Sequence, residues 1–396
     1  MKLHEKLLAF FISSAMAVSF CTFPSAYTAF EPYIAEETFT GAESLEESAD
    51  ILRNAMKNRQ DSVVIAVSPK IIPEGKSDID SIVKMSFKET GVPDEGDYLR
   101  FGIYRYRYNA KYDETEKVYN ITFQMQYNTT LEQEQAVTNR IESMMNEFDL
   151  KTKKPYERIK IIYDYVTENV SYDNEHDDTS EDRTAYSAYG ALINGVSLCQ
   201  GNAQLMYRLL TMSGISSRII PGKGNDDANH AWNIARIGRK YYYLDSTWDE
   251  GFSEENYRYF MRGSQDFDSL SASNTHTLQK WDGTESPIYS DYETESFSAR
   301  YPVAESSFIP FEYTLGDIDE NNAVDARDAT AVLVEYAEMS TSGETTFNEK
   351  EYMSADVNND GVTDSSDASH ILAYYSYVST GGKADMINFL KDEVNL

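Results

Sequence analysis

The chain has 396 residues, of which 41% are hydrophobic, enough for two or three domains with cores of their own. Lysine and arginine together number 35, against 66 aspartates and glutamates, which gives a formal net charge of -31. A charge of this sign repels phosphate backbones and anionic lipid surfaces, so the composition argues against nucleic acid and membrane surfaces as partners.

Residues 1–29 have the layout of a secretory signal peptide. Two lysines precede an apolar run at 7–20, and the small residues Ser25 and Ala26 follow it. The run is too short to favour a membrane span, so we expect an exported protein with no membrane segment in its mature form. Cleavage would also remove Cys21 and leave Cys199 without a disulfide partner.

Residues 30–150 are expected to form an N-terminal α/β region. Their periodicities predict helices at 44–59 and 130–148, and strands at 61–68, 98–110 and 117–129. No catalytic motif falls here, so the role of the region stays open. A prosegment that covers the functional site is one alternative.

Cys199 lies in GVSLCQGNAQLMYRLLTMSGI, residues 195–215, directly before apolar residues at helical spacing. We therefore expect the thiol at the N-terminus of a helix, where main-chain N–H groups favour the nucleophilic thiolate. The alternative is an inert, buried cysteine. A further helix is expected at 155–169, beginning at a proline.

His230 and Asp245 fall on two predicted strands, HAWNIARI and KYYYLDSTW, joined by the two-residue turn Gly238–Arg239. If Ile237 pairs with Lys240, the histidine and the aspartate are diagonal neighbours on one face of the hairpin, within hydrogen-bonding reach. A shift of one residue would turn Asp245 to the opposite face. The site prediction therefore depends on this register.

In that register the sequence predicts a catalytic triad. Asp245 would orient the imidazole, His230 would act as acid and base, and Cys199 would attack a carbonyl group to form a thioester. The N–H of Cys199 is the simplest oxyanion donor. Trp232 and Trp248 are expected in the core. His276, which has no pattern around it, is expected on the surface, and a supporting position behind the triad is the alternative.

Residues 155–250 resemble a bacterial transglutaminase-like domain. The matching motifs are YGALINGVSLCQG at 189–201, NHAWN at 229–233 and YYYLDSTW at 241–248, with the triad residues in the family's order. The resemblance implies an α+β, papain-like fold at 151–285, in which helices pack on an antiparallel sheet. It makes Cys199 the nucleophile, His230 the acid/base and Asp245 the orienting group.

Residues 286–311 lose periodicity and gain serine, glutamate and proline, so we expect a linker. Residues 312–396 then hold 18 acidic side chains against 4 lysines and arginines. Such a charge concentration favours cation binding.

A repeat with an offset of 39 residues fills this acidic segment, and each copy has an oxygen-rich 12-residue loop followed by a helix. The loops offer ligands at the positions that Ca²⁺ loops use, with Asn322 and Gly361 at the sixth position, where a positive φ is needed. We expect two Ca²⁺ ions. The predicted ligands are Asp317, Asp319, Asn321, Ala323, Asp325 and Asp328 in the first loop, and Asp356, Asn358, Asp360, Val362, Asp364 and Asp367 in the second.

The twelfth position of each loop is aspartate instead of the glutamate of ordinary EF-hands, and neither loop has a clear entering helix. In these respects the repeat resembles the type I dockerin of cellulosome-forming bacteria. The resemblance implies a small helical module at 312–396 that binds a cohesin of a scaffold protein in a calcium-dependent way. Ala326 and Arg327 in one copy, and Ser365 and Ser366 in the other, occupy positions that help to select the partner in that family.

These predictions combine into a secreted, scaffold-attached cysteine enzyme that acts on peptide or isopeptide bonds of a peptide or protein substrate. Hydrolysis by a peptidase or amidase is favoured, and a protein-crosslinking transglutaminase is the first alternative. A noncatalytic adaptor of a polysaccharide-degrading cellulosome is the second. A glycosidase would need paired carboxylates on opposed elements, for which the sequence has no signal.

Overall fold

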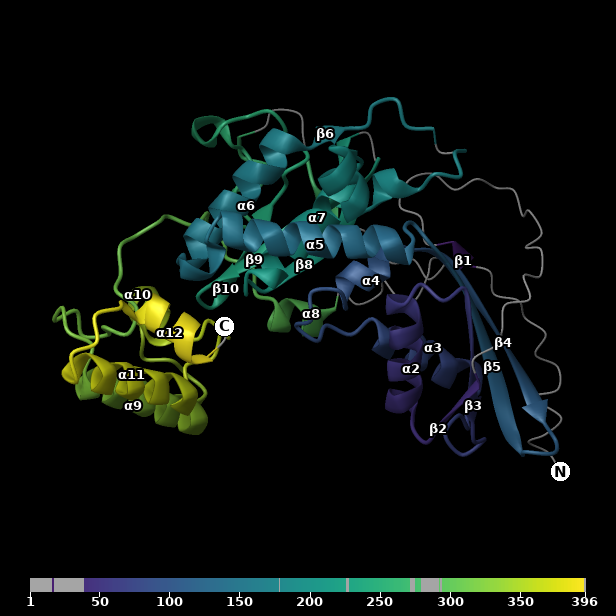
Figure 1. The fold of residues 1–396 in the computed structure, drawn as a ribbon, viewed down its shortest axis with the longest axis horizontal. Helices are drawn as coiled ribbons and strands as arrows, with labels where there is room; N and C mark the ends of the chain where they lie inside the picture. The colour runs from purple at the N-terminus through teal and green to yellow at the C-terminus, as the bar shows by residue number, and fades with distance from the viewer. Residues whose placement is uncertain are drawn as a thin grey trace.

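The computed structural model describes residues 16–17, 39–177, 179–225, 228–270, 275–278, 292 and 294–394 (Figure 1). Apart from residues 16–17, the predicted signal peptide lies outside these ranges, and so does Cys21. No helix in the described part of the chain is long and apolar enough to cross a bilayer.

The N-terminal region, residues 39–130, forms a five-stranded sheet together with residues 16–17, and two helices pack on this sheet (Figure 1). The strand order is β1-β4-β5-β3-β2, in which β2 and β3 are parallel and the other pairs antiparallel. The strands are β1 (Met16–Ala17), β2 (Phe39–Ala42), β3 (Ser62–Val67), β4 (Ile103–Asp113) and β5 (Val118–Tyr127), and the helices are α2 (Leu45–Lys57) and α3 (Lys76–Ser86).

The predicted strand at 98–110 was wrong in its first part. Residues Asp97–Gly102 form the short helix α4, and the ladder begins only at Ile103. All six residues of α4 are buried, because the helix lies against helix α7 (Cys199–Met212) and has no solvent-facing side. A helix that is buried on every side has no polar face, so its sequence does not show the helical period of apolar and polar residues.

The central region, residues 131–313, has an antiparallel four-stranded sheet, order β10-β9-β8-β11, with helices packed on it. Its helices are α5 (Leu131–Glu147), α6 (Pro155–Asn169) and α7 (Cys199–Met212), and its sheet strands are β8 (Ser217–Lys223), β9 (Asn229–Ile237), β10 (Lys240–Leu244) and β11 (Thr277–Leu278). Minor elements are the parallel pair β6 (Ser171–Tyr172) and β7 (Val196–Ser197), and single turns at Leu150–Thr152, Thr184–Tyr186, Gly190–Asn194 and Glu254–Asn256. The predicted α+β fold class is confirmed.

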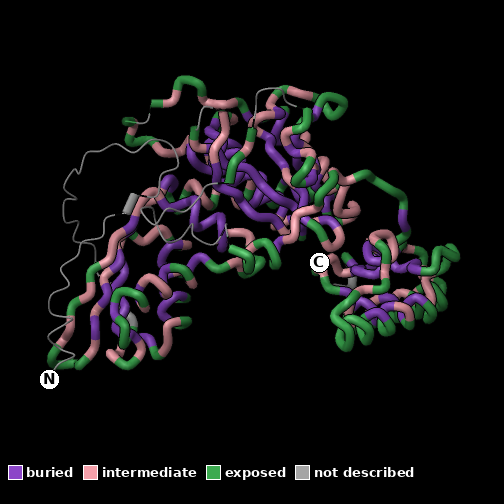
Figure 2. The backbone as a smooth tube through the Cα atoms, turned by 180° about the vertical axis from the view of Figure 1, so that it is seen from behind, coloured by how far each residue is buried: buried purple, intermediate pink, exposed green. Residues whose placement is uncertain are grey.

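One hydrophobic core extends through both of these regions. It includes Leu52 and Ile121 of the N-terminal region as well as Leu209 and Ile234 of the central region, all at most 2% exposed. The burial pattern is continuous between the two regions, as the purple segments of Figure 2 show. The core therefore continues across the boundary that the sequence suggested at residue 150.

Part of the expected linker packs on the central region, although many of its described residues are exposed. Residues 295–300 form helix α8 (Glu295–Arg300), and Tyr301 next to it is 7% exposed. The main chain after α8 also joins the sheet, since Tyr241 N–H donates to the oxygen of Pro302 and Ala304 N–H donates back to that of Tyr241. The aromatic residues in this segment are the physical reason, because their burial outweighs the entropy of a free linker.

The C-terminal region, residues 314–394, has its own small core around Ile318, Val332, Ile371 and Phe389. Its helices are α9 (Ala326–Ser342), α10 (Glu349–Ala355), α11 (Ser365–Ser379) and α12 (Met386–Val394), and α9 and α11 lie side by side (Figure 1). Helix α10 ends directly before Asp356. The prediction that neither loop has an entering helix was therefore wrong for the second loop.

The second acidic loop lies against the central region. Arg236 of β9 donates from Nη2 to the main-chain oxygen of Asn359 at 2.9 Å, and Asn359 Nδ2 donates to the oxygen of Gly214 at 2.9 Å. The Arg236 guanidinium fills the space that a side chain at position 361 would need, so Gly361, with φ 85°, is suited to this contact as well as to the turn.

Candidate active site and acidic loops

Cys199 is the first residue of α7 and is 2% exposed, as expected for a thiol at a helix N-terminus. The first turn of this helix packs closely on the preceding loop. A Cβ atom at Gly201 would lie 2.8 Å from the main-chain oxygens of both Ala185 and Ser187. Glycine at this position therefore lets the loop approach the turn that carries the thiol.

Polar side chains on either side of the thiol hold α7 in place. Gln200 Nε2 donates to the main-chain oxygens of Phe101, at 2.8 Å, and Tyr186, at 3.1 Å. Asn202 Nδ2 donates to Thr247 Oγ1 at 3.2 Å. The first contact reaches the N-terminal region and the last reaches the segment that follows Asp245, so the helix that begins with Cys199 is bound to both.

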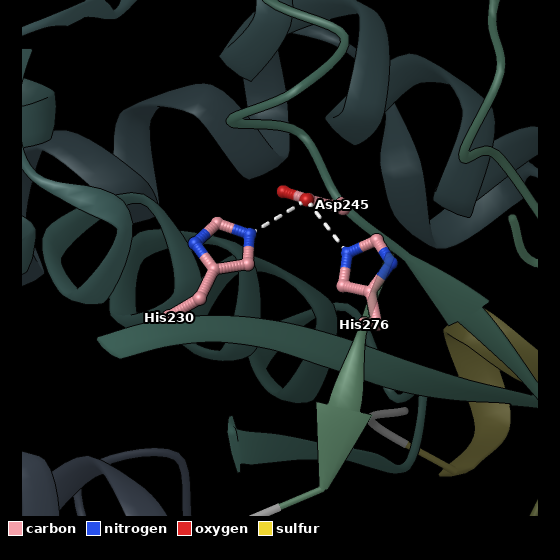
Figure 3. Close-up of side chains that lie close together, drawn as sticks. All are labelled: His230, Asp245 and His276. Atoms are coloured by element: carbon pink, nitrogen blue, oxygen red, sulfur yellow. Dashed lines mark hydrogen bonds and ion pairs between the residues drawn. The ribbon is translucent and has the colours of Figure 1, made fainter. Parts of the chain in front are cut away.

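The hairpin has the register that the sequence analysis required. Ile237 pairs with Lys240, and Asn233 pairs with Leu244. His230 and Asp245 consequently lie on one face, and His230 Nε2 is 2.8 Å from Asp245 Oδ2 (Figure 3). Asn233, on the same strand as His230, donates from Nδ2 to the main-chain oxygen of Ala203 in α7 at 3.0 Å, which ties the histidine's strand to the cysteine's helix.

Asp245 is 1% exposed and accepts hydrogen bonds at both carboxylate oxygens. Thr247 N–H and Trp248 N–H donate to Oδ1 at 3.0 and 3.3 Å, while two imidazoles face Oδ2. Burial opposes the ionised form, but His230, and after it His276, outweigh burial and hold the pKa of Asp245 well below its usual range. The carboxylate is therefore ionised and fixed in orientation.

His276 is the second imidazole on Asp245, so its expected surface position was wrong. Its Nε2 is 3.1 Å from Asp245 Oδ2, its Nδ1 is 2.7 Å from Asp268 Oδ1, and its side chain is 2% exposed. Figure 3 shows the two rings on opposite sides of Asp245. The strand next to His276, β11, has only two residues. This is too short for the sequence to show the alternation of apolar and polar residues by which a strand is predicted.

Aromatic rings enclose both histidines. Trp248 stacks on His230, with 4.6 Å between ring centroids and 14° between planes, so it packs on the proposed site. Phe267 stacks on His276 at 3.9 Å, and Trp248 is 4.2 Å from the same ring. Trp232 is 2% exposed, as expected for a core residue. This enclosure lowers the local dielectric and strengthens the polar contacts inside it.

A cavity of about 360 Å³ opens beside His276, and its lining includes Trp232, Phe267, Asp268 and Leu278. The donor atoms of His230, Asp245 and His276 lie within 4.8 Å of one another. Both imidazoles approach the carboxylate at ordinary hydrogen-bond lengths, so we interpret the three groups as an acid–base set.

The first acidic loop brings Asp317, Asp319 and Asp328 together, with oxygens within 4.8 Å of one another. Asp317 is 4% exposed, and Asp328 is fully buried. The predicted ligand Asp325 also caps α9, because it accepts from the N–H of Arg327 at 2.7 Å, and its role as a ligand stays a prediction. Asn322 has φ 67°, as its place in the loop required.

In the second loop Asp356 and Asp367 are the buried carboxylates. Oδ1 of Asp356 is buried without a hydrogen-bond partner among the described residues, as expected of an oxygen that binds a cation. Burial raises the pKa of both carboxyls to about 7. Asp364 caps α11 through the N–H of Ser366. This arrangement of acidic oxygens fits Ca²⁺ in both loops.

The remaining predicted ligands lie along the two loops. Asn321 and Asn358 each accept a hydrogen bond from a main-chain N–H two residues further on. Asp360 accepts from Asn358 Nδ2 and from the N–H of Val362. The assignment of the main-chain oxygens of Ala323 and Val362 as ligands stays a prediction.

Two family models match this chain. The transglutaminase-like superfamily matches residues 142–246, and the type I dockerin domain matches residues 315–374. The chain therefore contains a transglutaminase-like core domain followed by a type I dockerin domain. Type I dockerin domains typically bind calcium, and their presence implies binding to a cohesin.

Similar proteins cover parts of the chain. Kyphoscoliosis peptidase of Mus musculus is 24% identical over 127 residues, which are 29% of this chain and 19% of that protein. Its counterpart from Homo sapiens is 26% identical over 106 residues, 24% of this chain and 16% of that protein. The matched part is thus less than a fifth of these relatives. A solved structure of a TGase is 13% identical with a TM-score of 0.26, covering 53% of this chain and 59% of that one.

Proposed function

We propose that the protein is a cysteine acyl-transfer enzyme, most consistent with a peptidase or amidase, that is attached to a scaffold. The 2.8 Å contact between His230 and Asp245, on a strand tied to the helix that begins with Cys199, carries this proposal. The three side chains supply a nucleophile, an acid/base and an orienting carboxylate.

The chemistry follows from the ring orientation. Because Nε2 of His230 faces Asp245, Nδ1 is the nitrogen that would exchange a proton with Cys199. The thiolate attacks the carbonyl carbon, the C–N bond breaks, and the imidazolium gives its proton to the departing amine. Water then attacks the thioester and loses a proton to His230, which releases the acid and restores the thiol.

Hydrolysis and crosslinking share the thioester and differ in what resolves it. The curated relatives are named as peptidases, and this supports hydrolysis. A lysine amine in place of water would give the transglutaminase alternative, so an experiment has to offer both acceptors. Hydrolysis would break peptide or isopeptide bonds, whereas crosslinking would start from a side-chain carboxamide and form an isopeptide bond.

The C-terminal domain is proposed to bind a cohesin with two Ca²⁺ ions in its loops. Side chains on α9 and α11 form an exposed apolar face that includes Leu333, Val334, Tyr336, Leu372 and Tyr375, all at least 43% exposed. An apolar face on a small acidic domain is typical of a protein-binding surface. Attachment of this kind supports an extracellular, cellulosome-type location.

Comparison of the parent with Cys199→Ala tests the enzyme proposal. Both proteins are assayed for peptide release from a mixed protein substrate and for incorporation of a labelled amine. Release by the parent alone supports a peptidase, and amine incorporation by the parent alone supports crosslinking. Equal activity in both proteins would contradict the triad and favour the noncatalytic adaptor.

A further inference from the structure

His276 lies between two carboxylates, and each of its ring nitrogens faces one of them. Nε2 is 3.1 Å from Asp245, and Nδ1 is 2.7 Å from Asp268. A neutral imidazole has one N–H, so its other nitrogen would direct a lone pair at a carboxylate oxygen. The imidazolium, which donates from both nitrogens, is the form that satisfies this geometry. Burial opposes the charge, but the bonds to Asp245 and Asp268 outweigh it and raise the pKa of His276.

The charge of His276 acts on the same oxygen that holds His230. Oδ2 of Asp245 faces both rings, whose centroids are 5.6 Å apart. A carboxylate that already faces one imidazolium stabilises a second one less, and the two positive rings also repel each other. The charged or titratable groups around His276 are Asp245, Asp268, His230 and the hydroxyl-bearing Tyr259; the other neighbouring rings are Trp232, Trp248 and Phe267.

We propose that His276 is a positioning residue for the Cys199–His230 pair. The ring of His276 fixes Asp245 from the side opposite His230 and weakens the attraction of Asp245 for the proton of His230. A proton held less tightly passes more readily to the departing amine, so His276 makes His230 a stronger general acid. The same positive charge favours the thiolate. This inference rests on the proposed function, because it assigns His276 a role in that reaction.

His276→Gln tests the proposal, since glutamine keeps an N–H donor for Asp245 and removes the charge. The readout is the rate at which iodoacetamide alkylates Cys199 as a function of pH, located by peptide mass mapping, so that no substrate need be known. The pH at which the reactive thiolate–imidazolium pair forms, and the pH at which it loses its proton, should both rise. The second should rise by about two units, since a charge 5.6 Å from the His230 ring acts through an effective dielectric constant of about 20. His370→Gln, in α11 of the dockerin domain, is the matched control and should leave the profile unchanged.

The outcomes separate this inference from the proposed function. A lower rate with unmoved midpoints in His276→Gln would mean a purely structural role and overturn the inference. A parent thiol that titrates as an ordinary cysteine, near pH 8.5, would remove the ion pair and with it the proposed function. If His276→Gln does not fold, ¹⁵N NMR of histidine-labelled parent decides the question. The expected result is that both nitrogens of His276 stay protonated to a higher pH than those of a free histidine, and a neutral tautomer below that pH contradicts it.

Discussion

Asp97 of α4 and Arg218 of β8 form a buried, bidentate ion pair across 121 residues of sequence. Arg218 donates from Nε to Oδ2 at 2.7 Å and from Nη2 to Oδ1 at 2.9 Å, and Tyr292 donates to Oδ1 at 2.6 Å. The N-terminal region is thereby bound to the sheet that carries the candidate active site. A prosegment that leaves after cleavage would have to expose these charges, so the structure favours an integral N-terminal region.

Arg218→Met should lower the free energy of unfolding by about 3–5 kcal/mol, because it leaves the Asp97 carboxylate buried without its main partner. Urea unfolding of the full chain, followed by tryptophan fluorescence, measures the loss. Arg327→Met is the matched control, since its side chain is 67% exposed and should change stability little. An equal effect of the two substitutions would contradict the role of the ion pair.

Glu89 should make stability depend on pH. Burial, followed by the repulsion of Asp97, raises its pKa from 4.5 to about 7. Between these values the native state retains a proton that the unfolded state releases, so stability falls as the pH rises, by at most about 1.4 kcal/mol per pH unit.

Glu89→Gln should therefore lose this slope, and its stability relative to the parent should increase from pH 4.5 to pH 7. Urea unfolding at both pH values measures the difference. Glu147→Gln, at an exposed end of α5, serves as control because it should follow the parent. A parallel pH dependence of parent and Glu89→Gln would show that Glu89 ionises normally.

Asp245→Asn should reduce kcat/KM for peptide release by about 10²- to 10⁴-fold, because an amide nitrogen in the place of Oδ2 would favour the wrong tautomer of His230. KM should change less than kcat, as the carboxylate acts through the histidine. Asp164→Asn is the control; this carboxylate binds Lys160 and Tyr257 away from the triad. Activity within a few-fold of the parent would exclude Asp245 from the mechanism.

Gly201→Ala should destabilise the protein by about 1–3 kcal/mol and lower the reactivity of Cys199, because the added methyl group meets main-chain oxygens at 2.8 Å that cannot move independently. Gly41→Ala provides a matched substitution, since no atom lies within 4 Å of its added Cβ. Thermal unfolding and the iodoacetamide rate measure the two effects. Unchanged reactivity would mean that the loop yields without displacing α7.

The parent should bind two Ca²⁺ ions by isothermal titration calorimetry. Asp319→Ala and Asp360→Ala, which remove an exposed oxygen from the first and the second loop, should each weaken one site and leave the other intact. Glu338→Ala, on the exposed face of α9, should keep both sites. Two unaltered sites in Asp319→Ala would show that this carboxylate is no ligand.

Local patterns predicted much of the candidate site. The turn Gly238–Arg239 between two alternating strands was sufficient to set the hairpin register, and so the contact of His230 with Asp245. The apolar spacing after Cys199 was sufficient to place the start of α7. Both features depend on interactions between residues close in sequence, which a single sequence records.

The features that sequence reasoning missed depend on distant partners. His276 reaches Asp245 across 31 residues from beside a two-residue strand, and Asp97 reaches Arg218 across 121. The segment expected as a linker has polar composition, yet its aromatic side chains have a surface to bury against. Neither period nor composition specifies such pairings, because they arise only when the sheet and helices have assembled.

Strand β9 carries the candidate acid/base near one end, at His230, and meets the second acidic loop near the other, through Arg236. Six residues of extended chain, about 20 Å, separate the two positions. This single strand therefore connects the dockerin domain, which is proposed to bind the scaffold, with the proposed site of reaction. A protein attached to a scaffold through its dockerin domain would hold its reactive groups at a set distance and angle from that scaffold. The geometry of this attachment would then help to decide which neighbouring bonds come within reach.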